Sequence, residues 1–264
     1  MCTVTAVWQP QIGRGWSDDL PVLRVLCNRD EQRARPRSLP PRARILGDRR
    51  AVMPIDPTSG GTWIGVNDAG LVACLLNARP QVSTTGGKPS ESRPESRGGI
   101  VPRLLRTCSV SDAAVIGSRI DPACYPPFRV LLADHESHVV IESDGDSVTC
   151  NSRSFSRKPL LLASSGLGDH LVEPARRDLF HRLLDDHADP HDAQRCCHSH
   201  AWPGRGHVSV LMSRPDARTV SQTAIDLFST RAILRHMLVG DDLLPEPLVT
   251  VCELAVGRRS GVAA

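Results

Sequence analysis

The second residue of the chain is a cysteine, at the head of an alternating, strand-like run (residues 2–8). A start methionine is normally removed when the next residue is small, so we expect Cys2 to become the first residue. Its α-amine, with a pKa of about 7.7–8.0, would accept a proton near neutrality. Its thiol, with a pKa of about 8.5, would be the nucleophile, so one residue would carry both groups. The alternative is an ordinary small residue that starts a strand.

A charged pair closes the next predicted strand. Arg29 and Asp30 lie in the run Asn-Arg-Asp-Glu at residues 28–31, directly after the apolar stretch 22–28. Alternation along a strand puts the two side chains on opposite faces unless the strand ends between them. An exposed, charged strand end explains the same residues.

Three blocks of the sequence resemble one family. The opening Met-Cys-Thr, the run at 28–31 and the stretch GGTWIGVNDAGLVACLLNARP (60–80) resemble the NRDE-domain family, also called the transport and Golgi organisation protein 2 family. The resemblance covers the first 80 residues well, and the remainder more loosely through LLASSGL and RTVSQTAIDLF. That family in turn looks like the N-terminal-nucleophile hydrolases of the choloylglycine hydrolase and penicillin V acylase type.

The resemblance implies a fold and a chemistry. The fold is α+β, a four-layer αββα sandwich of two antiparallel sheets, with residues 1–264 as a single domain. The chemistry is cleavage of a non-peptide C–N amide bond by a mature N-terminal cysteine. An acyltransferase acting on a small amide or thioester through a Cys2 thioester uses the same groups. The alternative is a non-catalytic carrier or chaperone of the same fold that binds haem or a lipid-like ligand.

The resemblance also assigns catalytic roles to individual residues. Asp30 would hold the α-amine of Cys2, and Arg29 would favour the thiolate by proximity. Asn77, at the end of the strand at 71–77, would donate a hydrogen bond to the oxyanion, a contact worth roughly 2.7–4 kcal/mol. An asparagine in a turn before Ala-Arg-Pro accounts for Asn77 equally well.

Substrate contacts are assigned to Asn28, Ser164 and Arg218. The family has a second asparagine where this chain has Ser164 or Ser165, and a hydroxyl reaches less far than an amide. Arg218 stands before a Thr/Ser-rich strand, where it would hold a substrate carboxylate or be a solvated turn residue. This departure at Ser164 weakens the hydrolase assignment more than the fold assignment.

Histidine and cysteine concentrate between residues 187 and 207. Five of the ten histidines lie there, together with Cys196 and Cys197. Imidazole and thiolate suit zinc, copper or haem iron, but the spacing matches no defined metal motif. We therefore predict a solvated, flexible loop and no metal site. No cofactor is required by the proposed chemistry, and haem stays open as a bound ligand.

Many short strands surround a cluster of helices. Strands are predicted at 2–8, 22–28, 62–67, 71–77, 128–134, 138–143, around 148, at 159–165, 207–213, 220–228 and 248–254, and helices at 101–108, 112–119 and 173–188. Ser111 is the predicted cap of the second helix. Residues 33–44, rich in proline and arginine, cannot form a central strand. Residues 80–99, rich in Ser, Gly and Pro, predict a mobile surface loop.

Composition narrows the function classes. The formal net charge is +3, only two of the 32 basic residues are lysines, and aromatic residues make up 3% of the chain. Scattered arginines without an aromatic platform disfavour a nucleic-acid partner. No segment approaches the roughly 20 apolar residues that span a bilayer, and no secretory leader precedes the first strand. Nine cysteines without a paired framework indicate a reducing cytoplasm, and the oligomeric state stays open.

Overall fold

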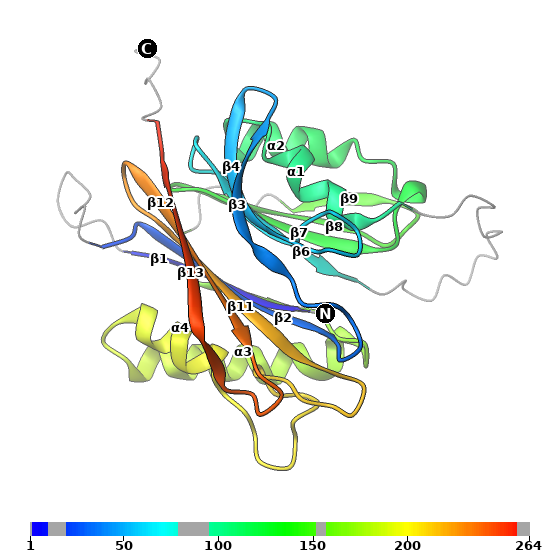
Figure 1. Cartoon of the computed structure of the whole chain (residues 1–264), viewed down its shortest axis with the longest axis vertical. Coiled ribbons are helices and arrows are strands. Elements are labelled where there is room, and N and C mark those ends of the chain that lie inside the picture. Colours follow the sequence, from blue (N-terminus) through cyan, green and yellow to red (C-terminus); the bar gives the residue numbers. More distant parts are fainter. Residues whose placement is uncertain (1, 10–19, 79–94, 152–156, 258–264) are drawn as a thin grey trace.

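The protein is an αββα sandwich in a computed structural model that describes residues 2–9, 20–78, 95–151 and 157–257. Two antiparallel sheets face each other, one helical pair covers each outer face, and Figure 1 shows these four layers. The helices are α1 (Ile100–Leu104), α2 (Val110–Ser118), α3 (Asp169–Asp186) and α4 (Pro190–His198), with short 3₁₀ turns η1 (Arg97–Gly99) and η2 (Pro122–Cys124). The predicted fold class is confirmed.

The first sheet has six strands in the order β10-β1-β2-β11-β12-β13. Its strands are β1 (Cys2–Trp8), β2 (Leu23–Gln32), β10 (Leu160–Ala163), β11 (Ala217–Leu227), β12 (Arg231–Val239) and β13 (Pro245–Ala255). The chain therefore places its first strand inside the sheet, between β10 and β2, where both edges of β1 are hydrogen-bonded.

The second sheet has seven strands in consecutive order from β3 to β9. They are β3 (Leu39–Leu46), β4 (Arg49–Ile55), β5 (Ile64–Asn67), β6 (Val72–Asn77), β7 (Phe128–Ala133), β8 (His138–Ser143) and β9 (Val148–Asn151). The proline-rich stretch supplies β3, which is an edge strand, as expected for a segment that cannot donate every ladder hydrogen bond.

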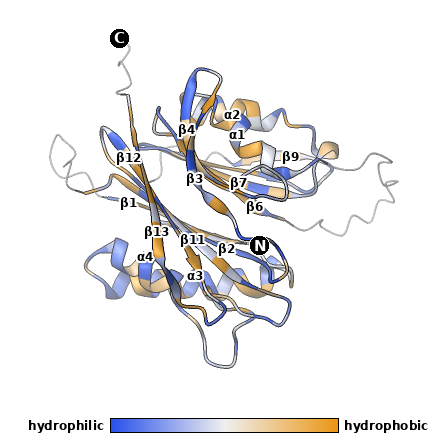
Figure 2. Ribbon diagram, in the orientation of Figure 1, coloured by the Kyte–Doolittle hydropathy of each residue, from blue (hydrophilic) through white to orange (hydrophobic). Residues whose placement is uncertain are grey.

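Alternation along β1 divides its side chains between two environments. Cys2, Val4, Ala6 and Trp8 belong to the apolar core between the sheets. Thr3, Thr5 and Val7 point the other way, where Val7 packs with Leu161 and Phe180 under α3 and α4. A third core joins the second sheet to α1 and α2. Figure 2 shows apolar residues along the strands and on the helices that cover them.

The layer of α3 is tied to β1 by a buried arginine. Arg176 is 1% exposed and occupies the apolar stripe of α3 with Val172, Leu179 and Phe180. Its Nη1 donates to Thr3 Oγ1 at 2.6 Å. Its Nε and Nη2 donate to the carbonyls of Val208 and Ser209 at 3.0 and 2.7 Å. The guanidinium therefore ties α3 both to β1 and to the turn at residues 208–209.

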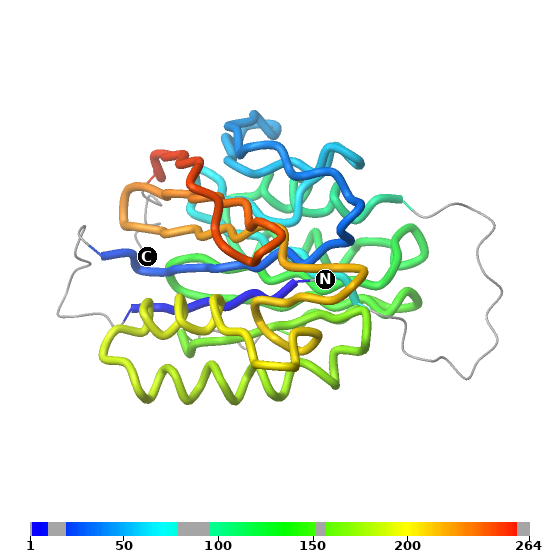
Figure 3. The backbone as a smooth tube through the Cα atoms, turned by 60° about the horizontal axis from the view of Figure 1, so that its bottom comes forward, coloured from blue at the N-terminus to red at the C-terminus, as the bar shows by residue number. Residues whose placement is uncertain are grey.

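The predicted histidine-rich flexible loop is wrong for its central part. Residues 190–198 form α4, which lies beside α3 over the first sheet (Figure 3). Asp189 caps the helix by accepting from His191 N, and Pro190 occupies the first turn, where its missing N–H costs nothing. His191, Cys197 and His198 are buried. A capped helix with a buried face therefore accounts for the positions of His191, Cys197 and His198.

A directed chain of hydrogen bonds seats α4 on the sheet. Gln194 Nε2 donates to Thr5 Oγ1 at 2.8 Å, so the Thr5 hydroxyl donates onward to His198 Nε2, also at 2.8 Å. His198 Nδ1–H then donates to Asn28 Oδ1 at 2.9 Å. Asn28 Nδ2 donates to the carbonyls of His198 and Val210. The polar side-chain atoms from Thr5 to Asn28 all have partners, and in Gln194 the buried Oε1 has none among the described residues.

The strand predicted at 207–213 is also wrong. This segment forms turns, and only Ser213 makes an isolated bridge, to Arg218. The carbonyls of Val208, Ser209 and Val210 are occupied by side chains of Arg176 and Asn28. Side chains therefore take the acceptors that a neighbouring strand would need.

Other boundaries differ in smaller ways. Ser109, not Ser111, caps α2 by accepting from Asp112 N at 3.0 Å. The predicted helix at 101–108 ends at Leu104. Strands β3, β4 and β12 were not predicted, and most of the predicted loop 80–99 lies outside the described residues.

We expect Arg176→Met to lower the free energy of unfolding by about 3–5 kcal/mol, because it removes the cation that most strongly opposes the desolvation of Asp30 and leaves two carbonyls without donors. Urea denaturation measures the change. The matched control is Arg177→Met, the half-exposed neighbour on α3, which should cost less than about 1 kcal/mol. Equal effects of the two variants would contradict the role given to Arg176.

We expect stability to fall in acid partly through His198. Burial first, and then the Arg176 charge, lower the pKa of His198 to about 3 in the folded protein. The unfolded chain binds a proton at about 6.5, so the neutral folded histidine contributes stability above pH 6.5 that is lost as pH falls toward 3. From pH 8 to pH 5 this loss is about 2 kcal/mol. Urea denaturation should show a shallower acid dependence in His198→Gln, whereas the exposed control His181→Gln should keep the wild-type slope.

Candidate active site

A cleft of about 380 Å³ opens at the end of the sandwich where β1 begins. It is lined by Cys2 and Asn77, by residues 29–32, and by polar and charged side chains from the loops after β2 and β4 and from η1. The further lining residues are Arg35, Asp56, Ser59, Thr62, Trp63, Leu75, Glu95, Ser96, Arg97, Gly98 and Pro126. The predicted nucleophile is therefore at the floor of a polar cleft.

Cys2 is held by its backbone on one side and by its strand partner on the other. Its nitrogen donates to Ser164 Oγ at 3.0 Å, and its carbonyl accepts from Ser164 N at 2.8 Å. Its Cα partner on β2 is Arg29, so the two side chains share the face between the sheets. Cys2 is 5% exposed. Ser164 therefore contacts the nitrogen that would become the α-amine if Met1 were removed.

The thiol of Cys2 is neutral in this environment. A hydrogen bond with the Cys27 thiol and burial raise the pKa of Cys2 well above its ordinary value, and the Asp30 charge adds to the effect. The expectation that a nearby arginine poises this group as a thiolate is not met here. Any nucleophilic attack must therefore remove the proton during the reaction.

Asp30 lies beneath the nucleophile, on the opposite face of β2 from Arg29. It accepts from Thr219 Oγ1 at 2.7 Å and is 1% exposed. Burial raises the pKa of Asp30, and the charge of Arg176 and the Thr219 hydrogen bond oppose that rise. The predicted alternation of Arg29 and Asp30 is thus observed, with one residue above the strand and one below it.

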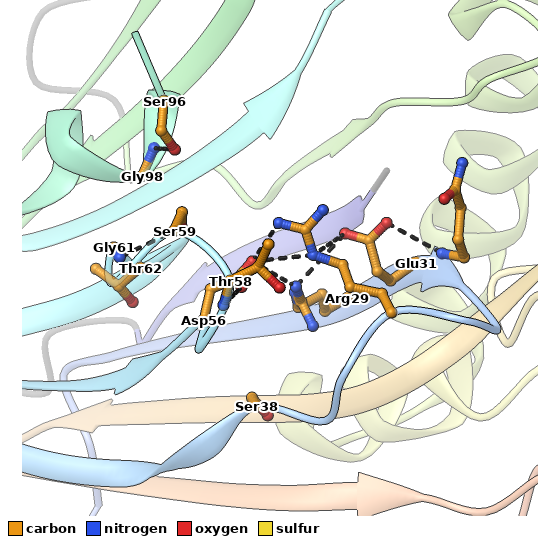
Figure 4. Close-up of polar contacts among 12 residues, drawn as sticks. Arg29, Glu31, Ser38, Asp56, Thr58, Ser59, Gly61, Thr62, Ser96 and Gly98 are labelled. Atoms are coloured by element: carbon orange, nitrogen blue, oxygen red, sulfur yellow. Dashed lines mark hydrogen bonds and ion pairs between the residues drawn. The ribbon is translucent and has the colours of Figure 1, made fainter.

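Arg29 is sandwiched between an aromatic ring and two carboxylates. Its guanidinium carbon lies 4.5 Å from the centroid of the Trp63 ring. Its Nη2 donates to Asp56 Oδ2 at 3.0 Å and reaches Glu31 Oε2 at 3.4 Å, as Figure 4 shows. Arg35 also binds Asp56, through Nη2 at 2.7 Å. The pKa of Asp56 is lowered because these hydrogen bonds and charges outweigh the desolvation that would raise it.

The far wall of the cleft is η1, which presents Arg97. Arg97 Nη1 donates to the carbonyl of Pro127 at 2.8 Å. The turn lies against the loop before β5 through a glycine pair: a Cβ on Gly61 would be 2.5 Å from the carbonyl carbon of Gly98. Only glycine at position 61 therefore permits this approach. Asn77, at the end of β6, lines the same cleft and is half-buried.

Two of the predicted substrate contacts lie elsewhere. Asn28 faces α4, and both protons of its amide are donated to backbone carbonyls. Arg218 donates through Nη1 to the carbonyls of Thr219 and Val239, and its Nε pairs with Asp241 at 2.8 Å. Both residues hold the first sheet together outside the cleft.

Sequence reasoning missed four residues of the site. Asp56 and Arg97 come from segments without a readable pattern, and Trp63 lies in the predicted strand at 62–67, where it was not assigned to the site. Arg176 had a signal: it occupies an apolar position of α3, four residues after Val172 and three before Leu179. A lone arginine on a helical stripe indicates a buried charge that needs a partner.

Within the described part of the chain, no group of three His, Cys, Asp or Glu side chains is arranged to hold a metal ion. The same residues include no helix long and apolar enough to cross a membrane.

The fold is that of the N-terminal-nucleophile hydrolases. The chain is similar to a penicillin V acylase from Agrobacterium tumefaciens, at 13% identity and a TM-score of 0.51, over 98% of this chain and 92% of that one. It is similar to an N-acylethanolamine-hydrolyzing acid amidase from Caenorhabditis elegans, at 12% identity and a TM-score of 0.54, over 86% and 92% of the two chains. It is also similar to a conjugated bile acid hydrolase from Clostridium perfringens, at 12% identity and a TM-score of 0.52, over 96% of this chain and 92% of that one.

The family follows from the sequence. The family model described as Transport and Golgi organisation 2 matches residues 1–192, and the chain belongs to that family. No curated protein matches the chain in sequence.

We expect Gly61→Ala to displace η1 and to cost about 1–3 kcal/mol of stability, because the added methyl group overlaps the backbone of Gly98. Thermal or urea unfolding measures this. Gly99→Ala is the matched control, since a Cβ there meets nothing within 4 Å. A Gly61→Ala protein as stable as the Gly99→Ala protein would show that the close approach is not maintained.

Proposed function

We propose that the protein is an N-terminal-cysteine hydrolase or acyltransferase that acts on a small amide or thioester. The observation that supports this most is the placement of Cys2. Its nitrogen is hydrogen-bonded to Ser164, its side chain lines the cleft, and the Asp30 carboxyl lies close enough to raise its pKa. Removal of Met1 would turn that nitrogen into an α-amine beside the thiol.

In the proposed reaction the α-amine takes the thiol proton as sulfur attacks the carbonyl carbon. This forms a tetrahedral intermediate with a C–S bond and a negative oxygen. The ammonium then gives its proton to the departing nitrogen or sulfur, the C–N or C–S bond breaks, and an acyl-Cys2 thioester remains. Water or another acceptor, deprotonated by the amine, attacks the thioester and releases Cys2.

The surrounding residues have separate roles in this scheme. Ser164 Oγ accepts one proton of the amine and so orients its lone pair. Asp30, buried below, favours the ammonium that forms transiently. Asn77 is the proposed donor to the oxyanion, because it is an amide side chain in the cleft.

The structural relatives support the same chemistry. They include an acylase, an amidase and a conjugated bile acid hydrolase. The lining of the cleft favours this function over a haem or lipid carrier, because sites for such ligands are predominantly apolar, whereas this one is mostly polar and charged. All nine cysteines are described and none forms a disulfide, which supports a reducing compartment.

The test is Cys2→Ala against a panel of 4-nitroanilides and aryl thioesters. Turnover should fall by roughly 10³-fold or more, because the nucleophile is gone while the fold is kept. With wild-type protein and a slowly hydrolysed thioester, mass spectrometry should find the acyl group on the peptide that begins at Cys2.

The control is Cys108→Ala, an exposed thiol outside the cleft, which should keep full turnover. Near-ultraviolet circular dichroism checks that both variants are folded. Turnover in Cys2→Ala equal to that of the wild type would rule out the mechanism.

A further inference from the structure

The first sheet ends in a long strand whose outer edge has no partner strand among the described residues. β13 is the last strand in the order β10-β1-β2-β11-β12-β13, and its 11 residues pair with β12 alone (Figure 1). Such an edge presents a row of free N–H and C=O groups to any strand that lies beside it.

The hydrogen-bond pattern shows which groups point outward. Val256 N donates to the carbonyl of Thr230 at 2.8 Å. These two residues are opposite each other, since the register pairs Leu254 with Ala232. Hydrogen-bonded and non-hydrogen-bonded pairs alternate along an antiparallel ladder, so the even-numbered residues of β13 bond to β12. The N–H and C=O groups that point to the free edge belong to Val249, Val251, Glu253 and Ala255.

β13 differs from the other edge strands of the two described sheets. β9 and β10 have only 4 residues each, and β3 carries two prolines and two arginines, which protect an edge from pairing. The prolines of β13 precede its regular stretch 249–255, which contains no proline, lysine or arginine. Val249 and Val251 are 41% and 57% exposed. This edge is therefore open to a further strand.

We propose that two copies of the chain pair antiparallel through residues 249–255, with Cys252 of each copy opposite Cys252 of the other. In this register Val249 is opposite Ala255, and Val251 is opposite Glu253. All the outward N–H and C=O groups of the stretch then find partners, and the first sheets of the two copies become continuous. The inference goes beyond the proposed function, because no residue of β13 lines the cleft.

The charges on the outer face of the sheet favour a second copy as the partner. Arg235 is opposite Val251 on β12, and its side chain is 43% exposed. Arg24 and Arg235 share one carboxylate, that of Asp226, so a positive charge is left on this face. The proposed register puts Glu253 of the second copy on the other side of Val251, about 10 Å from Arg235 between Cα atoms. Both long side chains lie on the same face and span that distance, and the two-fold axis makes this contact twice.

The limited extent of the contact sets the expected affinity. One pair of strands with two exposed valines in each copy is smaller than a standard interface, which buries about 800 Å² on each partner. We therefore expect a reversible dimer with a Kd on the order of 10 μM.

Sedimentation equilibrium of the reduced protein, from about 1 to 200 μM, measures the association. The average mass should rise from that of one chain to that of two. Val251→Glu should weaken the dimer about 10-fold or more, because it sets like charges opposite each other at Glu253 of the second copy. The matched control is Val115→Glu, at a valine that is 50% exposed on α2 over the second sheet, and it should dimerise like the wild type. A chain that stays monomeric at 200 μM, or a dimer unaffected by Val251→Glu, would overturn the proposal.

Cys252 reports the register directly. Its thiol lies beside β3, where it donates to the carbonyl of Pro41 at 3.5 Å. Directly opposite residues of a non-hydrogen-bonded pair have Cα atoms about 4.5 Å apart, within the range of a disulfide. Oxidation with diamide, which takes up the two thiol hydrogens, should link the copies through Cys252, as peptide mass mapping would show. Random collisions would favour the more exposed Cys196 instead, and a covalent dimer without the Cys252 link would contradict the register.

Discussion

The buried guanidinium of Arg176 is the contact on which the rest of the site depends. It carries a positive charge from α3 to the underside of β1, where it donates to Thr3, and its field opposes the desolvation of Asp30. Without that charge, Asp30 would take up a proton more readily and could not favour a cation at Cys2. The same guanidinium occupies the carbonyls of Val208 and Ser209. One side chain therefore links the packing of α3, the path of the 205–213 segment and the electrostatics around Cys2.

The two-residue period of β1 and β2 separates structure from chemistry. Residues on the lower face, Thr3, Thr5 and Asn28, make hydrogen bonds to α3 and α4 and are saturated. Residues on the upper face, Cys2 and Arg29, belong to the cleft and keep unused capacity. A shift of one residue in the pairing of β1 would exchange the side chains of the lower and upper faces. The polar network on the lower face therefore also maintains the register that places Cys2 in the cleft. The position of β1 between β10 and β2 likewise prevents that shift.

Much of this arrangement could be predicted from local pattern. Alternating apolar runs predicted most strands. The resemblance of three sequence blocks to a known family placed Cys2 together with the residues at 28–31. Prediction failed where side chains compete with the backbone. Residues 207–213 alternate like a strand, but Arg176 and Asn28 take their carbonyls. The histidines near residue 190 resemble ligands in composition, but one of them is a buried hydrogen-bond partner of Thr5. Arg97 and Trp63 line the cleft together with residues distant in the sequence, and no local period records that proximity.

The raised pKa of Cys2 changes how the chemistry should be understood. A preformed thiolate would need a nearby cation, yet Arg29 gives its charge to Asp56 and stacks on Trp63. For a thiol this buried, moving a proton over one short step to an amine on the same residue, as proposed, is less costly than maintaining a separated thiolate. Ser164 fits that scheme, because a hydroxyl is enough to orient an amine, even where an amide would reach further toward the oxyanion. In the proposed scheme, the departure from the family pattern therefore bears on oxyanion stabilisation and not on proton transfer.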